Sequence, residues 1–293
     1  MHKSGFVNII GNPNMGKSTL MNALVGERLS IITSKAQTTR HRIMGIVSGE
    51  DFQIVYSDTP GILKPSYKLQ ESMMKFVTGA VTDADVILYV TDTVERSDRS
   101  AEIIERISRS GIPTIVVINK IDLSTPEALD ALVERWQAEI PGARIVPVSA
   151  KENFNVEGLF RTILELLPEG PAFYPKDTLT DKTLRFFASE IIREKILKFY
   201  DKEIPYCCEI EIESYKEEPA IDRIAATIYV ARDSQKGILI GHKGEKLKRV
   251  GQTAREDMEQ FLGKKVFLQL FVKVSDDWRN DERQLRRFGY EQE

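Results

Sequence analysis

Cysteine is scarce in this sequence, and long apolar runs are missing from it. The chain of 293 residues holds two cysteines, Cys207 and Cys208, next to each other in a strand-like stretch. Because neighbouring residues of a strand point to opposite faces, we expect two plain packing residues there and no disulfide framework. The apolar segments at residues 86–90 and 114–118 are far shorter than the roughly 20 residues that a membrane-spanning helix needs.

Charge of one sign is not in excess either. The 41 Lys and Arg residues stand against 44 Asp and Glu, which gives a net charge of −3, so the total charge does not indicate a nucleic-acid partner. The distribution is more informative, because residues 209–222 are mostly acidic whereas residues 236–249 hold five Lys or Arg and one Glu. A local anion-binding surface is therefore compatible with the nearly neutral total.

Strand-like and helical segments alternate through the first half of the chain. Strands are expected at residues 6–10, 43–48, 52–58, 86–90, 114–119 and 144–149, with helices between most of them, for example at residues 18–25, 101–109, 127–139 and 156–167. This alternation predicts an α/β fold whose mostly parallel sheet is covered by helices on both faces. Ligand-binding loops are then expected at the carboxyl ends of the strands.

A proline-rich segment, PEGPAFYPKDTLT, follows the last of these helices and predicts a linker. We expect a first domain over residues 1–170, the linker over 171–181 and a smaller α+β domain over 182–293. The predicted order of the second domain is α-β-β-α-α-β, followed by a charged tail that ends in a helix. Its predicted segments are a helix at 184–200, strands at 208–214 and 224–232, a strand-like run at 238–240, a helix to about 261 and a strand at 266–274.

The first motif, GNPNMGKS at residues 11–18, joins an expected strand to an expected helix. Glycines let consecutive backbone N–H groups point at an anion, and the helix that follows adds the positive end of its dipole. Lys17 is expected to reach the β- and γ-phosphates, and the Ser18 hydroxyl to ligate Mg²⁺. The expected nucleotide-binding residues of this loop are Gly11, Asn12, Pro13, Asn14, Met15, Gly16, Lys17, Ser18 and Thr19.

Two more elements act at the phosphate end of the predicted site. In DTPG, residues 58–61, Asp58 is expected to hold Mg²⁺ through water and the Gly61 N–H to meet the γ-phosphate. Between the two motifs lies KAQTTRHRIMGI, residues 35–46, where Thr39, with Thr38 as the alternative, is expected to close onto Mg²⁺ only when a γ-phosphate is present. The predicted metal ligands are thus Ser18, Thr39 and Asp58.

The last two motifs are expected at the base of the nucleotide. In NKID, residues 119–122, the Asp122 carboxylate can accept two hydrogen bonds from guanine N1–H and the 2-amino group, which adenine cannot supply. Asn119 is expected to tie this loop to the phosphate loop, and Lys120 to lie along the base. The backbone N–H groups of Ser149, Ala150 and Lys151 are the expected donors to guanine O6. Each short motif alone is also typical of a solvated loop, but four in this order on strand ends predict a guanine-nucleotide site.

Together these segments resemble the bacterial Era GTPase family along essentially the whole chain. GNPNMGKSTL, KAQTTRHR, DTPGI, NKID and SAK are similar to the nucleotide motifs of that family, and SEIIREKIL, YDKEIPY and IGHKG are similar to its KH-type RNA-binding domain. The resemblance implies a P-loop GTPase domain followed by a smaller α+β KH-like domain of type II. It also implies a GTP-hydrolysing switch that uses Mg²⁺ and binds the 3′ end of 16S rRNA and the small ribosomal subunit precursor during 30S maturation.

One position departs from the Ras-type pattern. Ile62 follows DTPG where Ras-like enzymes carry a Gln that orients the attacking water, and an aliphatic side chain cannot do this. We therefore expect slow intrinsic hydrolysis, with catalytic roles for Lys17, Thr39, Gly61 and Asn14. Relatives with PNxGKS in the phosphate loop use the Asn to help bind K⁺ at the nucleotide, so K⁺ is a further expected cofactor. The alternative, that Asn14 only shapes the loop, stays open.

The turn Gly241-His242-Lys243-Gly244 opens a helix rich in lysine. A GxxG turn lets a sugar-phosphate backbone approach closely, while an adjacent apolar groove receives about four unpaired bases. Lys243, Lys246, Lys248 and Arg249 are the expected phosphate contacts. The competing interpretation is a surface turn in a protein-docking domain. The acidic residues Glu209, Glu211 and Glu213 are expected to be solvated sheet surface that could also repel RNA.

Two other functional classes compete with the GTP-gated RNA switch. One is a passive RNA-binding module with a structural nucleotide domain, against which Lys17, Ser18, Asp58 and Asp122 argue. The other is a membrane-associated or cell-cycle signalling GTPase whose C-terminal domain docks a protein; no lipidation motif supports it. Since MHKSGFVNII holds no secretory apolar segment, we expect a cytoplasmic protein. The family resemblance implies that part of it is peripheral on the inner membrane. We also expect a monomer, because no apolar interface stripe stands out.

Overall fold

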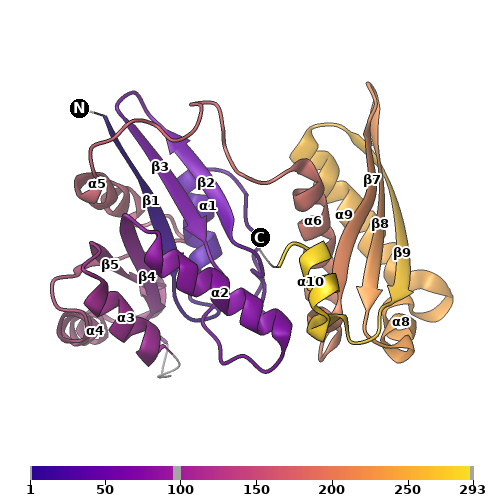
Figure 1. Cartoon of the computed structure of the whole chain (residues 1–293), viewed down its shortest axis with the longest axis horizontal. Helices are drawn as coiled ribbons and strands as arrows, with labels where there is room; N and C mark the ends of the chain where they lie inside the picture. Colours follow the sequence, from indigo (N-terminus) through magenta and orange to yellow (C-terminus); the bar gives the residue numbers. More distant parts are fainter. Residues whose placement is uncertain (1, 95–99, 291–293) are drawn as a thin grey trace. The chain divides into compact units, whose positions relative to one another are not determined.

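Two compact units make up the computed structural model, which describes residues 2–94 and 100–290 (Figure 1). The first unit comprises residues 1–66 and 70–181, and the second comprises residues 67–69 and 182–293. None of the helices in the described part of the chain is both long and apolar enough to cross a membrane.

A six-stranded sheet forms the centre of the first unit, in the order β2-β3-β1-β4-β5-β6. The β2–β3 pair is antiparallel and the remaining pairs are all parallel, which confirms the predicted mostly parallel sheet. All side chains of β4 and β5 are buried, as expected for parallel strands covered on both faces. The strands are β1 (Lys3–Ile10), β2 (Ile43–Ser48), β3 (Phe52–Asp58), β4 (Val86–Asp92), β5 (Thr114–Asn119) and β6 (Arg144–Pro147).

Helices cover both faces of this sheet. On one face, α2, α3 and α4 share an apolar core with β1, β4 and β5, in which Val77, Ile107 and Trp136 are buried. On the other face, α1 packs against α5 and β3. The helices are α1 (Lys17–Val25), α2 (Lys68–Thr82), α3 (Ala101–Ser110), α4 (Pro126–Glu139) and α5 (Val156–Leu166), with a short 3₁₀ turn η1 (Ile121–Leu123).

The linker is bound along the first unit. The Gln53 side chain accepts the N–H groups of Phe173 and Tyr174, and the Lys176 ammonium donates to two carbonyl oxygens of the β2–β3 turn. The last three linker residues then pair with the free edge of β2: Leu179 accepts from Ile46 N–H at 2.8 Å, and Thr180 Oγ1 and Asp181 Oδ1 bond to Met44 O and N at 2.6 and 2.9 Å. The linker is therefore anchored to β2, which begins directly after residues 35–42. We call these eight residues, the part of KAQTTRHRIMGI that precedes β2, the residue 35–42 segment.

The second unit has a three-stranded sheet in the order β7-β8-β9, with β7 antiparallel and β9 parallel to β8. Helices α6 and α9 pack on the sheet and on each other, around a core that includes Ile196, Val250 and Met258. The order α-β-β-α-α-β is as predicted, with one extra short helix. The elements are α6 (Leu184–Phe199), α7 (Ile204–Cys207), β7 (Glu209–Glu217), β8 (Ile221–Val230), α8 (Asp233–Ile240), η2 (His242–Gly244), α9 (Glu245–Leu262), β9 (Lys265–Val274), η3 (Trp278–Asn280) and α10 (Glu282–Arg287).

Two local predictions in this unit were wrong. Residues 238–240 are the last turn of α8 and not a strand, because Gln235 and Leu239, four residues apart, share the buried face of a helix. Cys207 ends α7 and Cys208 follows it, so the pair does not lie on opposite faces of a strand. Both cysteines are nevertheless buried and free, as packing residues should be.

The predicted solvated acidic face of β7 was wrong in part, because two of its three carboxylates are buried or half-buried against specific partners. Glu209 is only 6% exposed and accepts a hydrogen bond from the Tyr290 hydroxyl at 2.6 Å. Glu211 pairs with Arg287 of α10, and Glu213 with Lys273 of β9. Hydrogen bonding to Lys273 and Thr227 lowers the pKa of Glu213. Glu209 and Glu211 therefore hold the C-terminal segment, whereas Glu213 is exposed, as predicted for solvated sheet surface.

Candidate nucleotide site and nucleic-acid groove

The phosphate loop connects β1 to α1 through positions that only glycine can occupy. Gly16, immediately before α1, has a φ of 87°, and a Cβ there would lie 2.3 Å from the Asn119 side chain. A Cβ on Gly11 would lie 2.1 Å from the Val90 carbonyl oxygen. Glycine at both positions therefore lets the loop turn tightly and point the N-terminus of α1 at an anion.

A cavity of about 360 Å³ lies beside this loop and collects many of the predicted nucleotide residues. Lys17 lies at its wall, with Nζ donating to the Gly11 and Asn12 carbonyl oxygens at 3.0 and 2.9 Å. Gly61 fits closely against Pro13, since a Cβ on Gly61 would lie 2.8 Å from the proline ring. The predicted residues that line the cavity are Pro13, Asn14, Gly16, Lys17, Ser18, Thr19, Thr39, Gly61 and Lys120.

The three predicted metal ligands, Ser18, Thr39 and Asp58, lie within hydrogen-bonding distance of one another. Ser18 Oγ donates to Asp58 Oδ2 at 2.7 Å and lies 2.9 Å from Thr39 Oγ1, which is 3.4 Å from the same carboxylate oxygen. Asp58 is fully buried, and its other oxygen, Oδ1, has no hydrogen-bond partner among the described residues. A buried, unpaired carboxylate oxygen beside two hydroxyls fits Mg²⁺ and its bound water.

The structure distinguishes the two threonines of the residue 35–46 segment. The Thr38 hydroxyl donates to the Lys35 carbonyl oxygen at 2.6 Å and lies 2.6 Å from Thr33 Oγ1. Thr39, in contrast, is buried and faces Ser18. Thr39 is therefore the threonine placed for a metal ligand.

The two base-recognition motifs are joined to each other and to the phosphate loop. Asn119 Nδ2 donates to the Met15 carbonyl oxygen at 2.9 Å, and Asn119 Oδ1 accepts the Ala150 N–H at 3.0 Å. Ser149 Oγ donates to Asp122 Oδ1 at 2.6 Å. These bonds hold the carboxylate that is predicted to read guanine in a fixed position.

One part of the guanine prediction needs correction. The Ser149 N–H already donates to the Phe154 carbonyl oxygen at 3.1 Å. The Ala150 N–H likewise donates to Asn119 Oδ1 at 3.0 Å. Of the three predicted donors to guanine O6, the Lys151 N–H is therefore the one that has no other acceptor among the bonds of the described residues.

Sequence reasoning missed Asp92, which is buried at the end of β4. Its Oδ2 lies 2.6 Å from Lys120 Nζ, and the same ammonium donates to the Asn14 carbonyl oxygen at 2.6 Å. Asp92 thus fixes the lysine predicted to lie along the base. The sequence feature that could have identified Asp92 is a carboxylate at the end of a predicted strand, as at Asp58.

Ile62 is 2% exposed and packs in the core with Ile10 and Val77. Its side chain therefore points away from solvent and cannot hold a water at the γ-phosphate. The residue after DTPG serves the fold of the first unit, and the water must be positioned by another group.

The GxxG turn connects α8 to α9 in the second unit. Gly241, Lys243 and Gly244 have φ angles of 73°, 48° and 80°, and His242 and Lys243 are exposed at its tip. A Cβ on Gly241 would lie 2.7 Å from the Lys246 side chain, whereas one on Gly244 would meet open space. The turn thus presents bare backbone at the N-terminus of α9, where a phosphate can approach.

A groove of about 500 Å³ begins at Gly244 and runs between α9 and β9. Leu247, Leu268 and Leu270 supply apolar wall, and Lys248, Gln252 and Arg255 supply polar groups. An apolar cleft beside a GxxG turn, edged by cations, suits unpaired bases and their phosphates. Gln252 and Arg255 had no sequence signal of their own.

Two of the predicted phosphate contacts do not lie in this groove. The Arg249 guanidinium is 4.3 Å from the centre of the Phe199 ring, and Lys246 Nζ is 5.9 Å from the centre of the Tyr200 ring. Both cations therefore lie on the side of α9 that faces the end of α6. Only Lys248 of the three helix cations lines the groove, because the helical period places residues 246 and 249 on another face.

Comparisons with known proteins cover both units of the chain. Residues 6–120 match a family model described as 50S ribosome-binding GTPase, and residues 203–279 match the KH domain model. The chain is 46% identical to GTPase Era of Staphylococcus haemolyticus strain JCSC1435 over 291 residues, which cover 99% of this chain and 97% of that one. The chain belongs to the Era family of GTPases. GTPase Era of Alkaliphilus metalliredigens strain QYMF is 45% identical over 295 residues, 99% of both chains.

Solved structures of Era are similar over the same length. Era in complex with MgGDPNP and nucleotides 1506–1542 of 16S ribosomal RNA is 40% identical and covers 100% of both chains at a TM-score of 0.95. A variant of Aquifex aeolicus Era bound to GDP and AlF4− is 40% identical at a TM-score of 0.94, covering 99% of this chain and 100% of that one. The predicted family and fold class, a P-loop GTPase domain followed by a KH domain, are confirmed.

Asp58 generates a prediction about stability. Burial raises the pKa of this carboxyl above its ordinary value of 3.8, so the folded apoprotein holds the proton more tightly than the unfolded chain. Its folding stability therefore falls as pH rises from about 4 through the folded pKa. In EDTA, without nucleotide, we expect Asp58→Asn to melt a few degrees above the wild type at pH 7 to 8, with the difference shrinking towards pH 4.

Exposed Asp51→Asn serves as the control and should leave the melting curve unchanged at every pH. With Mg²⁺ and GTP the order should reverse, because a charged carboxylate holds the metal and its bound water more strongly than a neutral amide does. An Asp58→Asn variant that melts below the wild type in EDTA at pH 8 would show that its neighbours stabilise the charge.

Proposed function

We propose that this chain is a GTP-hydrolysing switch that binds the 3′ end of 16S rRNA and assists maturation of the small ribosomal subunit. The observation that carries the proposal is the full-length similarity to an Era that was solved with MgGDPNP and a 16S rRNA segment bound together. The intact nucleotide cavity and the GxxG groove of this chain support it. A passive RNA-binding module would not need the fixed Ser18, Thr39 and Asp58 set.

The phosphate motifs and the base motifs have distinct tasks. The loop N–H groups and Lys17 bind the phosphates, and Ser18, Thr39 and Asp58 hold Mg²⁺, which neutralises charge on the β- and γ-phosphate oxygens when bound. Gly61 offers its N–H to the γ-phosphate. In the base motifs, outside the residues that line the cavity, Asp122 selects guanine, since a carboxylate held by Ser149 would be left without its partners by adenine.

The switch rests on Thr39. Its hydroxyl belongs to the metal set, so the residue 35–42 segment is ordered by a γ-phosphate and loosened after hydrolysis. That segment leads into β2, to which Leu179, Thr180 and Asp181 of the linker are bonded. We propose the domain division 1–170, 171–181 and 182–293 on this basis, with the linker as the connection through which nucleotide state reaches the RNA-binding domain.

RNA binding is assigned to the groove at α9 and β9. Unpaired bases fit against Leu247, Leu268 and Leu270, while the backbone of the GxxG turn meets the sugar-phosphate chain. Lys243 and Lys248 are the cations placed to contact phosphates. Cytoplasmic location and a monomeric state complete the proposal. The peripheral membrane contact expected from the resemblance stays a prediction, which sedimentation with liposomes would measure.

The groove assignment is tested by Gly244→Asp. A carboxylate at the turn repels phosphate and adds a side chain where the RNA backbone must approach, so we expect affinity for a single strand copying the 16S 3′ end to fall at least about tenfold. GTP hydrolysis without RNA should not change. Fluorescence anisotropy and a phosphate-release assay measure the two effects.

Gly263→Asp is the matched control. Gly263 follows the last residue of the same helix with a φ of 64°, and a Cβ there also meets open space. The variant therefore adds one negative charge at a second left-handed position, at the opposite end of α9. If both variants lose RNA affinity equally, the loss reflects charge or folding and the GxxG assignment fails.

The role of Asn14 is tested with monovalent cations. Asn14 has a φ of 66°, so Asn14→Gly keeps the left-handed backbone and removes only the side chain. We expect hydrolysis to be roughly tenfold faster in K⁺ than in Na⁺ for the wild type, as for a cation that replaces an arginine finger. The variant should lose this difference. Equal wild-type rates in the two salts would leave Asn14 with a role in loop shape alone.

A further inference from the structure

Arg42 lies at the downstream end of the segment that carries Thr39, one residue before β2. Its side chain is only 12% exposed, which is rare for a cation unless every donor has a partner. The segment that ends at Arg42 is expected to change its order with the nucleotide. A buried arginine at its end therefore suggests a role beyond packing.

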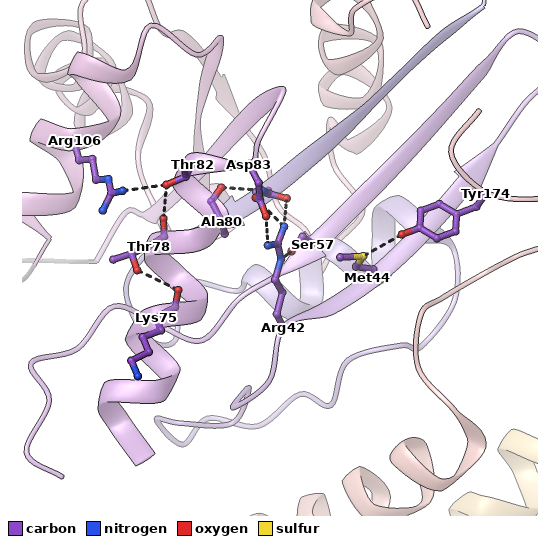
Figure 2. Close-up of polar contacts among 11 residues, drawn as sticks. Arg42, Met44, Ser57, Lys75, Thr78, Ala80, Thr82, Asp83, Arg106 and Tyr174 are labelled. Carbon is purple, nitrogen blue, oxygen red and sulfur yellow. Dashed lines mark hydrogen bonds and ion pairs between the residues drawn. The ribbon is translucent and has the colours of Figure 1, made fainter. Parts of the chain in front are cut away.

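The guanidinium of Arg42 joins three elements at once (Figure 2). Nε donates to Ser57 Oγ of β3 at 2.6 Å, and Nη2 donates to Asn8 Oδ1 of β1 at 3.2 Å. Nη1 and Nη2 form a two-pronged pair with Asp83, just past the end of α2, at 2.5 and 3.0 Å. Asn8 in turn donates from Nδ2 to the Ala80 carbonyl oxygen and to Asp83 Oδ1, both at 2.7 Å.

These contacts lie close to the metal set along the chain. Asn8 and Ser57 are directly opposed in the β1–β3 register, and both are fully buried. The residue after Ser57 is Asp58, and Thr39 lies three residues before Arg42. The helix whose end is held, α2, is the one that follows DTPG. A single side chain thus fixes the segment carrying Thr39 relative to the strand carrying Asp58.

We propose that Arg42 is a positioning residue for GTP hydrolysis. The clasp formed by Arg42, Asn8, Ser57 and Asp83 holds the downstream end of the residue 35–42 segment, so that only its upstream part moves and Thr39 returns to the same place at Mg²⁺ in each cycle. The positive charge also lies at the C-terminal end of α2, where the helix dipole favours it. This inference rests on the proposed GTPase switch.

The role predicts a selective effect on the triphosphate state. Because Thr39 contributes only when the γ-phosphate is present, loss of the clasp should weaken GDPNP binding and slow hydrolysis while leaving GDP binding intact. For Arg42→Ala we expect kcat and GDPNP affinity each to fall about tenfold, with GDP affinity within about twofold of wild type. The Mg²⁺ concentration for half-maximal rate should rise.

Two further variants should reduce kcat and GDPNP affinity less than Arg42→Ala does. Arg42→Lys should be intermediate, because one ammonium cannot serve Ser57, Asn8 and Asp83 in their separate directions. Asp83→Asn should be milder than Arg42→Ala, since Asp83 is 52% exposed and water can replace part of its pairing. If Arg42→Ala does not fold, these two variants and Ser57→Ala carry the test.

Arg106→Ala is the matched control. Arg106 of α3 donates to Thr82 Oγ1 at 3.0 Å and so holds the same end of α2 (Figure 2), but it makes no contact with the residue 35–42 segment among the bonds of the described residues. We expect wild-type kinetics for it. Melting of the GDP complex reports folding for every variant.

Three results would overturn the inference: an unchanged kcat in folded Arg42→Ala, an equal loss of GDP and GDPNP affinity, or an Arg106→Ala variant as slow as Arg42→Ala. Each leaves the proposed function intact, provided that the wild type hydrolyses GTP. Absence of hydrolysis in the wild type would instead remove the proposed function itself.

Discussion

The buried carboxylate of Asp58 is the interaction on which the rest of the first unit depends. It is fully removed from solvent, bonded on one oxygen by Ser18 and approached by Thr39, and left open on the other. Burying such a group is unfavourable without a cation, which is consistent with the raised pKa. The apoprotein therefore keeps a destabilising arrangement that Mg²⁺ with a nucleoside triphosphate relieves, and the binding energy of the nucleotide is linked to the position of Thr39.

Two sets of contacts lie at the start of β2, directly after the segment that carries Thr39. Arg42 ties the end of the residue 35–42 segment to β1, β3 and the end of α2. Two residues later, Met44 is bonded through both its N–H and its carbonyl oxygen to the last linker residues. The strand end that Arg42 fixes is thus the one to which the linker is bonded, two residues of chain beyond the segment that carries Thr39.

Much of this could be read from the sequence because it depends on local chemistry. Glycine spacing, strand-end carboxylates and β/α alternation each have a backbone or ligand requirement, and those at Gly11, Gly16, Asp58 and Asn119 lie as expected. Several errors come from contacts between distant segments: Glu209 accepts a hydrogen bond from Tyr290, and Lys246 and Arg249 lie over rings at the end of α6. Others are local, because Ser149 uses its N–H on Phe154, five residues further on, and residues 238–240 continue a helix. Asp92, Asn8 and Asp83 carry no motif, so only the folded sheet shows what they hold.

The measurement that tests the central claim is the affinity of the full chain for an RNA copying the 3′ end of 16S rRNA, by calorimetry with GDP and with GDPNP, each with Mg²⁺. Linkage between Thr39 and the RNA groove predicts affinities that differ by roughly 5- to 150-fold, and the same factor in the ratio of GDPNP to GDP affinity when RNA is bound first. Equal RNA affinities in the two nucleotide states would contradict the account, leaving a GTPase and an RNA-binding domain that share a chain without coupling.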